Sequence, residues 1–232
     1  MAPVILKELF EIDDSVPLVG YDSPSGKAFA CKNLGEPQGD LMAMICEPSI
    51  PMRMDQITAL DEFPGAGLVK CIDSGVVNWA SSGRRQPVLI FEKPAGSRVF
   101  ETMESVITPL TDDQIISGFL TPAVATLREF SARGLTHRNI RPSNLFYSDE
   151  SARLIMLGEC VSAPPGYNQP LIFESLECGL AVETGRGAGT PADDLFALGV
   201  TLLSLLIGRN PVPQIDDPYT FMLNRINTGS YA

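Results

Sequence analysis

The polar side chains best suited to chemistry are concentrated in one short segment, HRNIRPSNLFY, at residues 137–147. It contains the chain's single histidine, His137, together with Arg138, Asn139, Arg141 and Asn144. An imidazole can transfer protons near neutral pH, whereas a neutral amide accepts hydrogen bonds but cannot act as a general base. Two plainer interpretations also fit, because a lone histidine is commonly a satisfied core residue and a Ser-Asn-Pro type of turn arises by chance. The predicted elements on either side of the segment help to choose between these interpretations and a chemical role.

A helical pattern precedes this segment. From residue 111 onward apolar residues recur with helical spacing, and Thr111 with Gln114 forms a capping-box pattern at the start. Pro122 lies within the apolar stripe, so we expect one helix that is kinked near Thr121. The residues of the stripe are Ile115, Ile116, Phe119, Ala123, Leu127 and Phe130.

A second helix is predicted after the segment. Thr190 is the expected N-cap, with Pro191 at the first helical position, Asp193 completing the cap and Gly208 ending the helix. The face expected to be buried consists of Leu195, Leu198, Leu202, Leu205 and Leu206. Residues 161–189, rich in glycine and proline, are expected to form a long ordered loop before this helix.

The first half of the chain is patterned differently. Up to about residue 91, short apolar runs alternate with glycine, proline, asparagine and aspartate, which predicts strands. Only residues 52–60 suggest a helix, and Pro51 and Pro64 limit it to a few turns. The order of elements predicts an α+β fold whose two halves meet near residues 92–97.

Composition narrows the classes of function. The chain has 232 residues, 44% of them hydrophobic, with 28 acidic against 17 basic side chains and a net charge of −11. These values exclude wholesale disorder and allow one large domain or two small lobes. Because no Lys/Arg-rich run is present, nucleic acid and anionic membrane surfaces are not expected as partners.

The cysteines and the apolar runs indicate a cytoplasmic protein. The five cysteines are an odd number without a C-x-x-C pair, so we expect reduced core residues and no metal cluster. The acidic residues near the N-terminus interrupt any export signal. The longest uncharged apolar stretch, residues 195–208, is too short to cross a bilayer, so we expect no direct membrane insertion of this segment.

The segment at residues 137–147 resembles the catalytic loop of the protein kinase family. Active members carry His-Arg-Asp, then Lys/Arg-Pro, then Asn five residues after that Asp, then a strand leading to Asp-Phe-Gly. The residues that keep this pattern are His137, Arg138, Arg141, Pro142 and Asn144. Asn139 stands in place of the catalytic Asp.

The strand-like run after this loop extends the resemblance. Aligning LIMLG, residues 154–158, with the family's Asp-Phe-Gly strand places Met156 at the metal-binding Asp, Leu157 at the Phe and Gly158 at the Gly. A thioether is a poor ligand for Mg²⁺, which prefers oxygen. The resemblance therefore implies that the metal ligand is missing.

Two further stretches resemble the family's helical lobe and hinge. ADDLFALGVTLLSLLIGRNP resembles the central helix, where the resemblance implies that Asp194 accepts hydrogen bonds from the backbone holding His137 and Arg138. The competing interpretation is that Asp193 carries the helix cap and Asp194 is a solvated neighbour. PVLIFEKPAG resembles the strand and hinge between the lobes. Glu174 is either the glutamate of the family's Ala-Pro-Glu motif, held by an arginine, or unrelated to it.

The N-terminal half resembles the family more weakly. It has no G-x-G-x-x-G sequence, and LMAMIC places Ile45 or Cys46 where the family has a phosphate-binding lysine. Asp55 and Glu62 flank the short helix that carries the lysine's glutamate partner in the family, but no lysine is present for them.

The resemblance implies a two-lobed protein kinase-like fold. We expect a reduced β-rich N-lobe at residues 1–92, a hinge at 93–97 and a helical C-lobe at 98–232 that is truncated at its C-terminus. Phosphoryl transfer needs a lysine, a metal carboxylate and a base, and Cys46, Met156 and Asn139 supply none of them. We therefore expect a pseudokinase without cofactor or metal, with weak or absent ATP binding, that binds another protein as a scaffold or regulatory module.

Other functions stay open at this point. One is an atypical nucleotide-dependent transferase in which Glu159 has become the metal ligand beside Asn144, although a solvated loop carboxylate is the favoured interpretation of Glu159. A weakly active kinase is another. A third is a structural domain that positions a C-terminal partner or a membrane segment.

Overall fold

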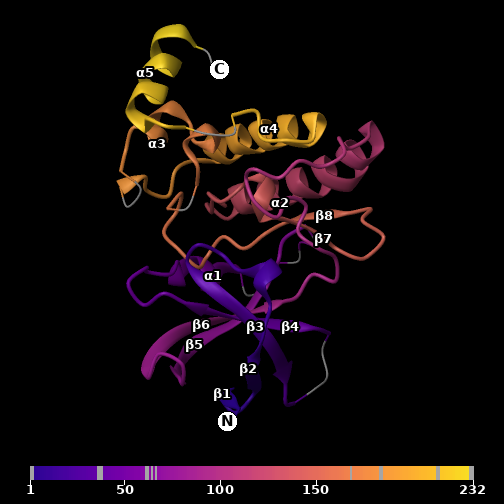
Figure 1. Ribbon diagram of the computed structural model, residues 1–232, viewed down its shortest axis with the longest axis vertical. Helices are drawn as coiled ribbons and strands as arrows, with labels where there is room; N and C mark the ends of the chain where they lie inside the picture. The colour runs from indigo at the N-terminus through magenta and orange to yellow at the C-terminus, as the bar shows by residue number, and fades with distance from the viewer. Residues whose placement is uncertain are drawn as a thin grey trace.

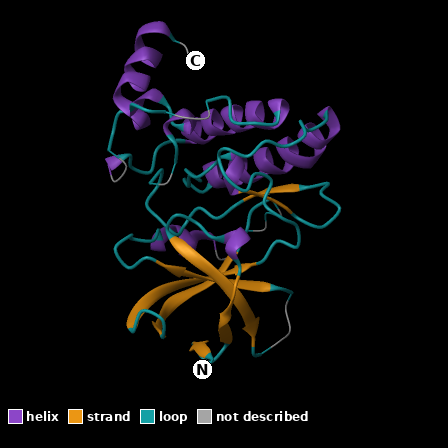
Figure 2. Ribbon diagram, in the orientation of Figure 1, coloured by secondary structure: helices purple, strands orange, loops and turns teal. Residues whose placement is uncertain are grey.

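The computed structural model has two lobes stacked along its long axis, a β-rich lobe below and a helical lobe above (Figure 1). The structure describes residues 3–35, 39–60, 63, 65, 67–167, 169–182, 185–212 and 215–229. The order of secondary structure therefore changes from strands to helices, as the sequence predicts (Figure 2). None of the helices in these residues is long and apolar enough to span a membrane.

The N-lobe is a six-stranded antiparallel sheet with the strand order β1-β2-β3-β4-β6-β5. The strands are β1 (Val4–Leu6), β2 (Phe10–Pro17), β3 (Gly26–Asn33), β4 (Leu41–Cys46), β5 (Cys71–Trp79) and β6 (Arg84–Glu92), and a one-turn 3₁₀ helix, η1 (Val19–Tyr21), follows β2. The predicted short helix is α1 (Met54–Leu60). Strands and helix thus occur in the half of the chain where the sequence predicts them.

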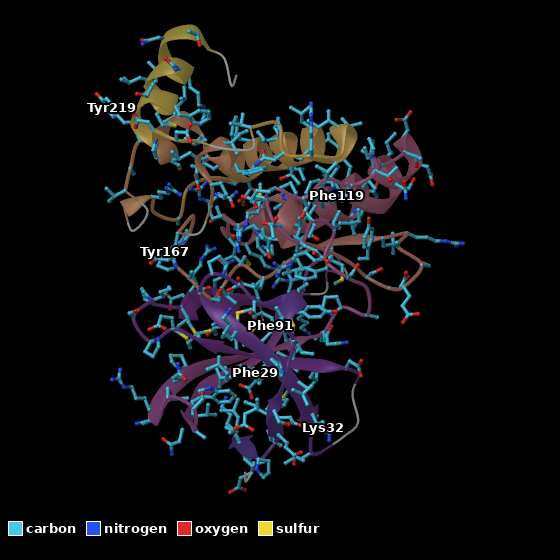
Figure 3. All side chains as sticks on the ribbon, in the orientation of Figure 1. Phe29, Lys32, Phe91, Phe119, Tyr167 and Tyr219 are labelled. Carbon is cyan, nitrogen blue, oxygen red and sulfur yellow. The ribbon has the colours of Figure 1, made fainter. Side chains whose placement is uncertain are left out.

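Strand β4 is buried on both faces, and its alternation separates two cores. Ala43 and Ile45 belong to a core inside the curved sheet. Met44 and Cys46 point the other way, into the larger core that joins the lobes. That larger core includes Phe91 of β6 and Phe119 of the helical lobe, which Figure 3 shows in the two lobes. The two lobes therefore share one continuous apolar core.

The C-lobe begins with a kinked helix. A π-helical stretch, η2 (Gln114–Leu120), continues into α2 (Thr121–Ala132), and Thr111 N–H donates to Gln114 Oε1 at 3.0 Å in the predicted cap. Pro122 follows the π turn directly, so its missing N–H is accommodated there. The π turn also shifts the apolar stripe, so Ile115 is buried while Ile116 is 57% exposed. The prediction that Ile116 lies on the buried face is wrong for this reason.

The remaining C-lobe elements are short except for two helices. They are η3 (Pro142–Asn144), β7 (Leu145–Tyr147), β8 (Ile155–Leu157), η4 (Leu171–Phe173), α3 (Leu176–Gly179), α4 (Pro191–Ile207) and α5 (Pro218–Thr228). Strands β7 and β8 form an antiparallel pair below α2 (Figure 1). The expected loop before α4 contains η4 and α3, and its residues 168, 183 and 184 lie outside the described ranges.

Helix α4 begins and ends as predicted. Thr190 N–H donates to Asp193 Oδ2 at 2.7 Å, and Gly208 has a left-handed φ of 72° at the C-terminal end. Its buried face is rotated from the predicted one, because Leu198 and Leu205 are buried but Leu195 and Leu206 are 56% and 45% exposed.

The rotation of α4 is fixed by Asp194. This carboxylate is 2% exposed and accepts hydrogen bonds from the His137 and Arg138 N–H groups, both at 2.7 Å. Arg138 has a left-handed φ of 58°, unusual for a side chain of this size. Asp194 therefore holds a strained turn in place, and the competing interpretation of a solvated Asp194 is wrong.

Replacing Asp194 should cost more stability than replacing its neighbour. Asp194→Ala leaves two buried N–H groups without an acceptor, which should lower the free energy of unfolding by about 3 kcal/mol or more. Asp193→Ala removes the helix cap and should cost about 1 kcal/mol. Urea unfolding of the two variants beside the parent protein measures both. Equal, small losses would contradict the anchoring role of Asp194.

Candidate functional site

His137 is a neutral, structural residue beneath the loop. Its Nδ1 accepts from Asn139 N–H at 3.2 Å, so the ring proton sits on Nε2, which donates to the Gly158 carbonyl at 3.1 Å. The ring is fully buried and stacks on Phe130. Burial lowers the pKa of His137 to about 3. A histidine with both nitrogens occupied and this pKa does not serve as a general base near neutral pH.

The two asparagines of the loop are bound to the chain itself. Asn139 Nδ2 donates to the Glu159 carbonyl at 2.9 Å, and Asn139 Oδ1 accepts from the Arg141 guanidinium. Asn144 Nδ2 donates to the Asn139 carbonyl at 2.8 Å and to the Glu159 carbonyl at 3.0 Å. The amides therefore fasten the loop to the segment after β8, and neither carries a charge that could take up a proton.

Met156 lies inside a short strand. It is the middle residue of β8 and pairs with Phe146 of β7, between the buried Ile155 and Leu157. The chain leaves the strand at Gly158, and the next residue, Glu159, has a carboxylate oxygen 3.5 Å from Asn139 Nδ2. The assignment of Met156 to the metal position stays a prediction from the alignment.

Gly158 keeps its expected structural role. Its N–H donates to the Asn144 carbonyl at 2.7 Å, and a Cβ at this position would collide with the Asn144 side chain. Only glycine allows β8 and the loop to approach this closely.

Glu159 is buried, so the interpretation as a solvated carboxylate is wrong. It is 6% exposed, its Oε2 accepts from the Val161 and Ser162 N–H groups at 2.9 Å, and its Oε1 accepts from Ser162 Oγ at 2.7 Å. Its charge also acts on the guanidinium groups of Arg53, Arg98 and Arg141. Burial lowers the pKa of Arg141 to about 10, and the charge of Glu159 opposes that fall.

These neighbours make Glu159 a poor magnesium ligand. Two backbone N–H groups and a hydroxyl already occupy its oxygens. A divalent cation would also enter a region where arginines outnumber the carboxylate, and like charges repel strongly in a buried site. The carboxylate is therefore balanced by the chain's own cations.

The lysine position is neutral. Of the two candidates, Cys46 faces the lobe interface and Ile45 the core of the sheet. Burial raises the pKa of the Cys46 thiol, so it stays uncharged. Asp55 is exposed on α1, and Glu62 lies outside the described residues. The side chain of α1 that faces inward is Gln56, whose Nε2 donates to Cys160 Sγ at 3.2 Å.

Sequence reasoning missed Tyr21, which lies at the hinge. Its hydroxyl donates to the carbonyls of Pro94 at 2.9 Å and Gly96 at 3.2 Å. Its ring stacks on Phe146 with centroids 5.5 Å apart and planes 3° from parallel. The segment that carries it, VGYDSPSGK, has no local pattern that marks the tyrosine, because the partners of Tyr21 are distant in the sequence.

Arginines connect the loop to both lobes. Arg53, just before α1, donates to the carbonyls of His137 at 3.0 Å, Cys160 at 3.1 Å and Thr136 at 2.9 Å. The N-lobe helix is thereby tied directly to the C-lobe. This contact satisfies backbone carbonyls and leaves the guanidinium little freedom to bind a ligand.

Glu174 is held by arginines, as the Ala-Pro-Glu interpretation expects. It is completely buried, with Arg138 Nη2 at 2.7 Å from one oxygen and Arg186 Nη1 at 3.6 Å from the other. Arg225 Nη2 of α5 donates to the Glu174 carbonyl at 2.9 Å. This cluster links the catalytic loop, the segment before α3 and α5.

The state of His137 predicts a pH dependence of stability. Because its folded pKa lies below its usual value near 6.5, the unfolded chain binds a proton that the folded protein does not. Stability from the neutral ring is complete above pH 6.5 and should fall by about 1.4 kcal/mol per pH unit below it. Urea unfolding of the parent protein and of His137→Gln at pH 7, 6 and 5 measures this.

Both proteins contain the same carboxylates, so the pH dependence of stability that the carboxylates cause cancels when the two proteins are compared. The stability advantage of the parent protein over His137→Gln should shrink as the pH falls from 6.5 to 5. An advantage that stays constant over this range would show that His137 is not buried in the neutral form.

Comparison with known proteins identifies the fold. No family model matches the sequence. The kinase domain of Mycobacterium tuberculosis PknI superimposes with a TM-score of 0.64 and 16% identity over 94% of this chain and 83% of its own. A double mutant of that domain gives a TM-score of 0.67 with 17% identity, over 95% of this chain and 84% of its own.

A third solved structure agrees. The crystal structure of Rad53 1-466 in complex with AMP-PNP superimposes with a TM-score of 0.65 and 15% identity over 96% of this chain. This chain spans 54% of that Rad53 chain. Similarities at this level of identity concern the fold, and together they show that this chain has a two-lobed protein kinase-like fold.

Proposed function

We propose that this protein is a catalytically inactive kinase-like domain, a pseudokinase, that binds another protein as a scaffold or regulatory module. The observation that carries the proposal is the state of the three positions that phosphoryl transfer requires. Asn139 is a neutral amide at the base position, Cys46 is a neutral thiol at the lysine position, and Met156 is a thioether at the metal position. The nearby Glu159 carboxylate is already bound to backbone N–H groups. No cofactor or metal is part of this proposal.

The fold is maintained although these groups are lost. Asp194 still anchors the loop, His137 still supports it, and the buried Arg138–Glu174 pair still links it to the following segment. Such a scaffold presents a fixed surface without performing chemistry. Helix α4 also leaves Leu195, Leu203 and Leu206 exposed, an apolar surface of the kind that protein partners cover. The partner proposed is therefore another protein, in the cytoplasm, where the five buried free thiols would stay reduced.

One observation favours the alternative of a nucleotide-dependent transferase. The Glu159 carbonyl accepts from Asn144 Nδ2 at 3.0 Å, and a Glu159 carboxylate oxygen lies 3.5 Å from Asn139 Nδ2, so a carboxylate is close to the amides of the loop. To bind a metal, Glu159 would have to exchange its bonds to Val161 and Ser162 for the cation, among the arginines that surround it. We regard this as the second candidate, which binding experiments can distinguish.

ATP with Mg²⁺ or Mn²⁺ should leave the melting temperature unchanged at millimolar concentrations. A ligand at about a hundred times its dissociation constant would add about 2.7 kcal/mol to the free energy of unfolding, a change that a thermal melt detects. The matched variant is Glu159→Gln, which keeps the shape of the side chain and removes its charge. An active protein kinase domain serves as the positive control.

A metal-dependent rise in melting temperature that Glu159→Gln abolishes would overturn the proposal and establish the transferase. A rise in melting temperature that depends on neither the metal nor Glu159 would show that the nucleotide binds without catalytic geometry. That result would contradict only the part of the proposal that says ATP does not bind.

A further inference from the structure

We propose that the hinge contains a binding site for a phenol ring and that the chain fills this site with its own Tyr21. The loop at residues 18–26, called here the plug loop, then acts as a built-in ligand that holds the lobes together. The inference goes beyond the loss of catalysis, because it assigns a specific occupant to the cleft.

Three groups of the chain surround the half-buried ring. The hydroxyl of Tyr21 meets two hinge carbonyls, those of Pro94 and Gly96. One ring face lies parallel to Phe146, which is 3% exposed, and Lys93 Nζ is 5.7 Å from the ring centroid. Parallel stacking and a hydroxyl pointing at two acceptors are the features by which proteins recognise a phenol.

The plug loop is fastened on both sides of Tyr21. Before it, Leu18 N–H donates to the Ala28 carbonyl at 2.8 Å. After it, the Asp22 carbonyl accepts from Arg98 Nη2 at 2.7 Å. Ser25 is completely buried, and its Oγ lies 2.6 Å from Ser162 Oγ of the C-lobe. The loop therefore links the sheet, the hinge and the segment after Glu159 through the chain's own contacts.

The acceptors around Tyr21 suit a phenol. The two carbonyls that face the hydroxyl accept only, and Pro94 has no N–H with which to donate to a ligand. The site is therefore matched to a planar ring that carries a hydroxyl donor.

Removing the ring and supplying it in solution tests the site. Tyr21→Ala should melt at a lower temperature than the parent protein, and 4-methylphenol at millimolar concentration should restore part of the loss. Toluene lacks the hydroxyl and should need about a tenfold higher concentration for the same shift, the value of one hydrogen bond. The matched control is Tyr219→Ala, which removes a tyrosine that is 70% exposed and should show no rescue.

Tyr21→Phe covers the case in which Tyr21→Ala does not fold. It keeps the stacked ring and loses only the hydroxyl, so its melting temperature should fall by about 2–4 °C. An unchanged melting temperature for Tyr21→Phe would overturn the site, as would 4-methylphenol stabilising Tyr21→Ala and Tyr219→Ala equally. Neither result bears on ATP binding by the parent protein, so failure of this inference is distinct from failure of the proposed function.

Discussion

The buried carboxylate of Asp194 is the constraint on which the helical lobe depends. It binds two successive N–H groups of a turn in which Arg138 has a left-handed backbone. Because the carboxylate belongs to α4, the turn and the helix must keep one relative orientation. His137 then reaches the Gly158 carbonyl and Arg138 reaches Glu174. Each of these contacts needs the preceding one, so the geometry of the loop follows from a single buried charge.

In the function that we propose, the same geometry does not serve phosphoryl transfer. Burying a charged base, a metal-binding carboxylate or a lysine costs desolvation free energy unless a group of opposite charge lies beside it. Here Asn139 and Cys46 are neutral, and the one carboxylate, Glu159, is balanced by arginines of the chain. Arg53 and the plug loop tie the lobes together. The described residues between the lobes therefore form part of the protein's internal packing.

Features that depend on neighbouring residues could be predicted from the sequence. Features that depend on contacts between distant parts of the chain could not. Helix caps and the motif that contains His137 depend on nearby residues, so they were predicted correctly. The burial of Glu159 was not, because it depends on how the segment after β8 packs against the rest of the chain. The buried face of α4 was misjudged because Asp194, rather than the leucines, sets its rotation. Tyr21 was missed because its partners are distant carbonyls, which a sequence does not show.

If the chain's own side chains fill the space between the lobes, no nucleotide should enter there. Hydrogen exchange of the backbone amides, followed by mass spectrometry with and without millimolar ATP and Mg²⁺, measures this. We expect exchange at residues 18–26 and 93–97 to be slow without ligand and unchanged when ATP and Mg²⁺ are added. Fast exchange of both segments in the free protein, with protection gained only in the presence of ATP and Mg²⁺, would contradict it.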